Sequence, residues 1–104
     1  GLSLNALQFG GAQVISYGFI RDEVGAEVLK KQSEKNGSYK KIILKKNRIT
    51  GAVFVRDIER AGIFRYLIEN KVNVGTYKEK LLEPDFNWAY VQNDIRDQLF
   101  TKVQ

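Results

Sequence analysis

The sequence contains no cysteine, no histidine and no methionine among its 104 residues. Their absence removes thiolate nucleophiles, the thiolate and imidazole ligands of metal ions, and the side chain best suited to proton transfer near neutral pH. No disulfide can hold the fold, so the composition gives no support to a secreted scaffold. We therefore expect a cytoplasmic protein without the most common kinds of catalytic or metal centre.

Long apolar runs and nucleotide-binding turns are missing as well. No run approaches the ~18 apolar residues of a membrane span, and the opening residues 1–5 lack the charged region of a signal peptide. The glycines do not form a Gly-x-Gly-x-x-Gly turn between a strand and a helix, the cradle that dinucleotides require. Asp94 and Asp97 have a spacing that solvated helices show constantly. We predict no membrane partner and no catalytic, cofactor-binding or metal-binding residue in this chain.

What the sequence does contain is enough apolar material for one core, since 43% of the residues are hydrophobic. The charge is uneven. Residues 1–56 carry ten Lys or Arg against four Asp or Glu, whereas residues 57–104 carry seven against eight. Such a basic half can attract phosphates, nucleic acid or an acidic protein. Lysines that protect and solvate a sheet edge explain it equally directly, and we prefer that interpretation.

The first half of the chain has the composition of strands separated by turns. We expect strands near residues 13–20, 26–32, 39–46 and 49–55, and a strand or short helix at 2–9. Asn36-Gly37 and Asn47-Arg48 have the chemistry of hairpin turns, so the later strands form a meander. Gly18 marks a bulge or a close approach of two backbones.

The second half is predicted to be helical. Asp57 is placed to cap a helix that continues to Ile68, and Thr76 with Glu79 has capping-box spacing for a short helix. A last helix carries apolar residues at Ile95, Leu99 and Val103 and is expected to pack back on the domain. The predicted fold class is α+β: an antiparallel sheet of about 4–5 strands with helices packed on one face.

The same patterns predict the contents of the core. We expect Val53 and Val55 to lie with Ile42 and Leu44 under the helix that begins near Asp57.

Residues 39–62 carry a more specific pattern. A Tyr39-Lys40-Lys41 strand, a tight turn, a Gly51-Ala52 strand ending at Asp57 and a helix start at Arg60-Ala61-Gly62 follow one another. This arrangement resembles the C-terminal domain of flavin-dependent pyridine nucleotide-disulfide oxidoreductases, in the branch of NADH oxidase, NADH-rubredoxin reductase and the nitrite reductase large subunit. Leu4–Gly10 and Val14–Gly18 are similar to the segment with which these enzymes enter that domain.

The resemblance covers about residues 2–70 and leaves a helical tail at about 75–104 outside it. Arg56 departs from the family pattern, which usually has glycine before the aspartate. The departure bears on whether another group approaches the helix start closely.

The resemblance implies a parent protein that binds FAD and NAD(P)H in two preceding domains and passes hydride equivalents to an acceptor. This chain, one domain over residues 1–104, would itself be no enzyme and would hold neither cofactor. It would serve as an interface domain that packs on the flavin domain, a second subunit or an electron-accepting protein. The candidate interface residues are Lys40, Lys41, Lys45, Arg56 and Trp88.

The alternative is a stand-alone basic module that binds nucleic acid or an acidic protein. Stacking of bases would require aromatic side chains exposed together on one sheet face. The strand aromatics available for this are Tyr17, Phe19, Tyr39 and Phe54. We do not expect nucleic acid as the partner, because the core needs these rings.

Overall fold

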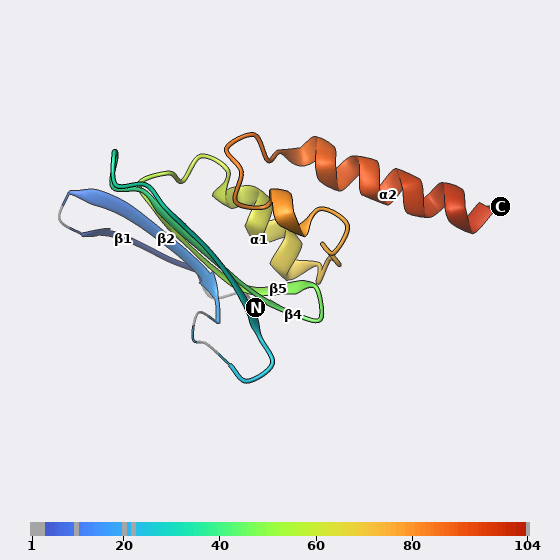
Figure 1. Ribbon diagram of the computed structural model, residues 1–104, viewed down its shortest axis with the longest axis horizontal. Helices are drawn as coiled ribbons and strands as arrows, with labels where there is room; N and C mark the ends of the chain where they lie inside the picture. Colours follow the sequence, from blue (N-terminus) through green and yellow to red (C-terminus); the bar gives the residue numbers. More distant parts are fainter. Residues whose placement is uncertain (1–3, 10, 20, 22, 104) are drawn as a thin grey trace.

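The computed structural model describes residues 4–9, 11–19, 21 and 23–103. Within them the chain forms one antiparallel sheet with helices on one side of it (Figure 1). The strands are β1 (Leu4–Phe9), β2 (Ala12–Gly18), β3 (Glu27–Gln32), β4 (Tyr39–Lys45) and β5 (Arg48–Val55), in the order β1-β2-β5-β4-β3. The helices are α1 (Ala61–Glu69), the 3-10 turn η1 (Lys78–Lys80) and α2 (Trp88–Val103). The predicted α+β class and the β3-β4-β5 meander are confirmed.

The β4–β5 hairpin closes with a two-residue turn. Lys46 and Asn47 both have positive φ, 52° and 63°, which is the type I′ geometry whose twist matches that of the flanking strands. Lys45 pairs with Arg48, so Arg48 is already part of β5. The prediction of a turn was right, but its centre lies one residue earlier than Asn47-Arg48.

A β-bulge decides which residues of β5 face the helices. Leu44 pairs with Ile49, whereas Ile43 pairs with Gly51, so Thr50 is an extra residue in β5. An extra residue shifts the alternation of side chains by one position. Ile49 faces the core before the bulge, and Ala52 and Phe54 face it afterwards.

The bulge corrects the predicted core. Ile42 and Leu44 are fully buried in it, as expected. The placement of Val53 and Val55 beside them was wrong, because these two valines lie on the opposite face of the sheet and are only half-buried.

Helix α1 covers the centre of the sheet. Its buried residues Ala61, Ile63, Phe64 and Leu67 face the sheet, and the Phe64 ring lies 4.9 Å from that of Phe54 on β5. The ring of Phe86, from the segment before α2, lies 5.5 Å from Phe64 on the other side. The helix therefore joins the sheet and the C-terminal segment in one core.

Asp57 does not cap α1, contrary to the prediction. The chain turns tightly at Arg56, where φ is 69° and the Asp57 N–H donates to the Val55 carbonyl at 2.8 Å. A second turn, from Ile58 to Ala61, precedes the helix, whose N-cap position is Arg60. The Asp57 carboxylate instead pairs with the Lys40 ammonium at 3.0 Å.

The tail differs from its prediction in two places. Tyr77 and Leu81 are buried, but the predicted short helix is only the 3-10 turn η1, and the Thr76 hydroxyl donates to Asp94 instead of capping a helix. Helix α2 exists and buries Val91 near its start.

The outer part of α2 extends away from the body of the domain (Figure 1). Ile95 is 41% exposed and Leu99 is 59% exposed, so the expectation that they pack back was wrong. The side chain of Val103 lies outside the described residues.

Candidate interaction surfaces

The face of the sheet turned away from α1 carries a group of apolar residues near its centre. We call its central part the open sheet face. By strand register its apolar residues are Val14, Val28, Tyr39, Val53 and Val55, and the polar residues Ser16 and Lys41 lie among them, each paired with Val53. All five are half-buried, and none packs against the buried core. Both helices lie on the other side of the sheet (Figure 1). An antiparallel sheet with one solvated face normally alternates apolar and polar residues, so the apolar outward positions make this face a candidate contact surface.

One end of this face is closed by the chain itself. A side chain on Gly51 would place its Cβ 1.8 Å from the Phe19 carbonyl oxygen, so the backbone after β2 passes directly over β5 there. The Phe19 N–H donates to the Thr50 carbonyl at 2.9 Å, which fixes this crossing. Ile43, next to it, is only 1% exposed. The close approach expected at Gly18 is confirmed, since a Cβ there would lie 2.4 Å from the Thr50 oxygen.

The three candidate lysines do not form one patch. Lys40 lies on the helix side of β4, its side chain is 13% exposed, and it is engaged with Asp57. Lys41 is the next residue of the strand and lies on the opposite face, because successive residues alternate. Lys45 is exposed near the hairpin turn, with its ammonium 3.7 Å from Glu23.

Arg56 and Trp88 lie in two other places. Arg56 is exposed where β5 ends, and its side chain lies against Gly37, where an added Cβ would be 3.0 Å from Nε. Its positive φ of 69° explains why glycine suits this position. Trp88 is 42% exposed at the start of α2 and meets Tyr66 of α1 edge-on, with ring centroids 5.2 Å apart.

A basic hollow at the hairpin end was not predicted as a unit. The hollow has a volume of about 510 Å³ and is lined by four basic residues, Lys45, Lys46, Arg48 and Lys71, and by apolar residues that include Ile49 and Ile68. The Arg48 guanidinium donates to the carbonyls of Lys71 (3.2 Å) and Lys46 (3.3 Å), which holds it over the turn. Lys46 and Arg48 belong to the basic half noted in the sequence, but only the fold brings Lys71 beside them.

The aromatic residues of the strands do not share an exposed face. Tyr17 and Phe54 are 6% and 2% exposed and belong to the core under α1. Tyr39 lies on the other face, and Phe19 is exposed after β2. The sheet therefore offers no platform on which these four rings could stack bases together.

Two other kinds of site are absent from the part of the chain that the structure describes. No group of three or more acidic, histidine or cysteine side chains is placed to hold a metal ion. No described helix combines the length and apolarity that crossing a bilayer requires.

Comparison with protein families gives one match. The model for the rubredoxin NAD+ reductase C-terminal domain matches residues 4–72, about two thirds of the chain, from β1 through α1. A search of curated proteins gave no match. The matched part contains the whole sheet and its covering helix, whereas η1 and α2 lie outside it. The chain belongs to the family of the C-terminal domain of rubredoxin NAD+ reductase, an oxidoreductase domain family.

Proposed function

We propose that this chain is the non-catalytic C-terminal domain of an FAD- and NAD(P)H-dependent oxidoreductase of the cytoplasm. Residues 1–104 would act as one interface domain, and the two cofactors would be held by the domains that precede it. Family membership supports an oxidoreductase as the parent protein. The missing thiol and imidazole side chains support a non-catalytic role for this domain. The domain would position its neighbour and cover it.

The observation that carries this proposal is the open sheet face. Val53 and Val55 sit side by side with Val14 of β2, which pairs with Val55, and no described helix covers them. Burying half-exposed valines against another domain removes apolar surface from water, which stabilises the contact. The occupant we propose is the flavin-binding domain, because a C-terminal domain is tethered to it and meets it at high effective concentration.

A binding experiment tests this assignment. The flavin-binding part of the parent, made as a separate fragment with FAD bound, is titrated with the 104-residue chain in a calorimeter. We expect one-to-one binding that Val53→Asp weakens at least about tenfold, because a carboxylate would be desolvated in an apolar contact. Val24→Asp is the matched control, since Val24 is fully exposed in the turn before β3. Val14→Asp repeats the test on a second strand, and circular dichroism confirms that each variant is folded.

Three results would contradict the proposal. The first is that the chain binds a second copy of itself, or an electron-accepting protein, through Val53 and does not bind the flavin fragment. The second is that Val53→Asp and Val24→Asp weaken binding equally. The third is that the purified chain alone carries stoichiometric FAD or oxidises NADH.

A second candidate, binding of an acidic partner or nucleic acid, is favoured by the basic hollow at Lys46, Arg48 and Lys71. Titration of single-stranded RNA at two salt concentrations tests it. We expect weak, sequence-indifferent binding that falls by roughly 0.7 log units per log unit of salt for each phosphate contacted. Sub-micromolar affinity near physiological salt, lost in Lys46→Glu, would establish this function in place of the first.

A further inference from the structure

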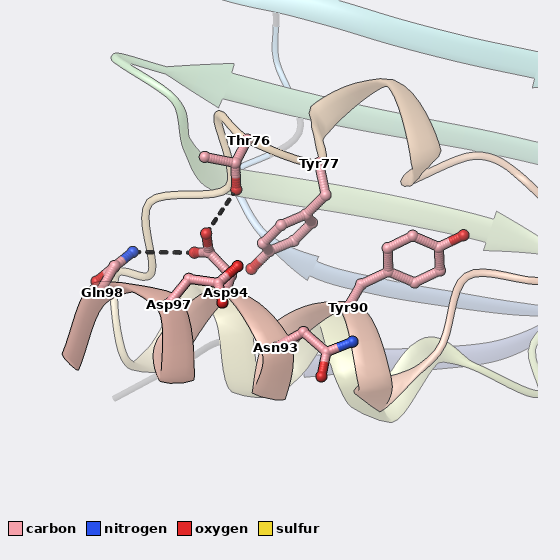
Figure 2. A pocket seen from close by; sticks show the side chains of 7 residues that line it. All are labelled: Thr76, Tyr77, Tyr90, Asn93, Asp94, Asp97 and Gln98. Carbon is pink, nitrogen blue, oxygen red and sulfur yellow. Dashed lines mark hydrogen bonds between the residues drawn. The ribbon is translucent and has the colours of Figure 1, made fainter. Parts of the chain in front are cut away.

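A second hollow lies on the helical side of the molecule, between the turn at Thr76 and Tyr77 and the side of α2 that faces this turn (Figure 2). It is an open hollow of about 580 Å³, wide enough to admit a side chain from another polypeptide. All of its lining residues fall between positions 76 and 98, outside the family match at 4–72. It is therefore a property of this chain's tail, and it is independent of the open sheet face.

One carboxylate in this hollow is held in a fixed orientation. The Thr76 hydroxyl donates to Asp94 Oδ1 at 2.7 Å, and the Gln98 amide donates to Asp94 Oδ2 at 2.9 Å (Figure 2). A carboxylate oxygen can accept two hydrogen bonds, and each oxygen of Asp94 accepts one here, so each can accept another from a ligand. No described lysine or arginine forms an ion pair with Asp94. The hollow thus carries negative charge within a chain whose net charge is +5.

Tyr77 supplies a second, independent sign of a ligand. Its side chain is 6% exposed, and its hydroxyl oxygen is buried without a hydrogen-bond partner among the described residues. The ring is held by stacking on Phe86, with centroids 5.9 Å apart and planes 22° apart. Its hydroxyl is directed toward α2 on the side of Asp94 (Figure 2). Buried hydroxyls in folded proteins are normally bonded, so this one is poised for a donor or acceptor from outside the chain.

The hydroxyl keeps its proton at neutral pH. Burial, and then the negative charge of Asp94 and the nearby Tyr66, raise the pKa of Tyr77 to about 12. A neutral phenol both donates and accepts hydrogen bonds, whereas Asp94 only accepts them. The polar groups of the hollow therefore suit a ligand rich in donors and positively charged.

We propose that this hollow binds a guanidinium group on an aliphatic stem, the chemistry of an arginine side chain in a polypeptide. Guanidinium carries five N–H donors in one plane, which matches the acceptors on Asp94, Asn93 and Tyr77. The rings of Tyr77 and Tyr90 line the same hollow and provide flat apolar walls for the stem and for stacking of the cation. A compact ammonium ion would use fewer of these acceptors, and an anion would be repelled by the Asp94 carboxylate.

The test is a titration of the isotope-labelled chain by two-dimensional NMR. The ligand is N-acetyl-argininamide, and the neutral isostere N-acetyl-citrullinamide is its control. We expect saturable shifts of the side-chain amides of Asn93 and Gln98 with a Kd in the low millimolar range, and at least about tenfold weaker binding of the citrulline compound. The chain alone is used, so failure of the flavin-domain proposal would not affect the result.

Matched variants locate the contact. Asp94→Asn and Tyr77→Phe should each weaken binding at least about threefold, since each removes one polar contact and leaves the shape of the side chain. Glu34→Gln makes the same charge change as Asp94→Asn in the exposed β3–β4 turn and should leave the affinity unchanged.

Several outcomes would overturn the proposal: no saturation at Asn93 and Gln98, equal binding of the citrulline compound, or tighter binding of N-acetyl-lysinamide. Unchanged affinity in Tyr77→Phe would contradict a hydrogen bond between the Tyr77 hydroxyl and the ligand. Tighter binding of agmatine than of N-acetyl-argininamide would identify a free small molecule as the ligand and reject the polypeptide source.

Discussion

Replacing Gly51 by alanine tests the closest backbone contact in the fold. A Cβ at this position would lie 1.8 Å from the Phe19 carbonyl oxygen and 2.5 Å from its carbonyl carbon. Both are backbone atoms, so no side chain can rotate away to relieve the clash. Real Cβ atoms essentially never come closer than 3.0 Å, and the Phe19 backbone must therefore move by more than about 1 Å.

That movement has a cost that follows from the contacts it breaks. The hydrogen bond from the Phe19 N–H to the Thr50 carbonyl, 2.9 Å long, is lost or stretched, at about 0.5–1.5 kcal/mol. Overpacking a buried site adds about 1–3 kcal/mol. Together these contributions should make Gly51→Ala lower the free energy of unfolding by about 1.5–4.5 kcal/mol.

The same substitution at Gly62 is the control. Gly62 is the second residue of α1, and an added Cβ there meets nothing within 4 Å. Alanine leaves the unfolded chain fewer conformations than glycine does, so Gly62→Ala should stabilise the protein by up to about 1 kcal/mol. Denaturant unfolding, followed by the fluorescence of the single tryptophan Trp88 and by circular dichroism, measures both variants. A change below about 0.5 kcal/mol in Gly51→Ala would refute the close approach of Phe19 and Gly51.

Three further perturbations test separate parts of the structure. Leu44 is 0% exposed, so Leu44→Ala should cost about 2–5 kcal/mol in denaturant unfolding; a loss below about 0.5 kcal/mol would place its side chain at the surface. Arg56 has a φ of 69°, so Arg56→Gly should leave stability unchanged or raise it by up to about 2 kcal/mol, whereas Arg56→Ala should give no gain; a clear loss in the glycine variant would contradict the turn. The pKa of Tyr77 is raised to about 12, so its neutral form is favoured by folding. This contribution is fully present below the unfolded pKa of about 10 and is lost as pH rises toward 12. Unfolding measured between about pH 9 and 11 should therefore show a shallower decline in Tyr77→Phe than in the original chain, and identical slopes would contradict the assigned cause.

The sequence alone was sufficient for most of the elements and for their order. Runs rich in β-branched residues, separated by Asn-Gly and Gly-Gly pairs, predict strands and hairpins because these signals are local. The burial of Ile42 and Leu44 followed from the apolar run of β4. The absent thiol and imidazole side chains excluded kinds of chemistry by composition alone. The resemblance at residues 39–62 pointed to the family that the match over residues 4–72 then showed.

Only the tertiary structure decided which residues form surfaces. Simple alternation from Ile49 puts Val53 and Val55 in the core, but the extra residue Thr50 reverses the alternation, and the sequence does not reveal where two strands slip past each other by one residue. Because of the turn after β5, Asp57 lies before the helix N-terminus, and its carboxylate forms an ion pair with Lys40 of the neighbouring strand β4.

The tail shows the same division most clearly. Periodicity predicted the helix that carries Ile95 and Leu99, because a helix is built from contacts three and four residues apart. Whether that helix lies on the body depends on the path of the chain before it, and here α2 leaves the body after burying Val91. The hollow that brings Tyr77 to Asp94 depends on a hydrogen bond between Thr76 and Asp94, 18 residues apart, which has no local signal. Local interactions fix the elements, and long-range packing alone determines which of their side chains meet.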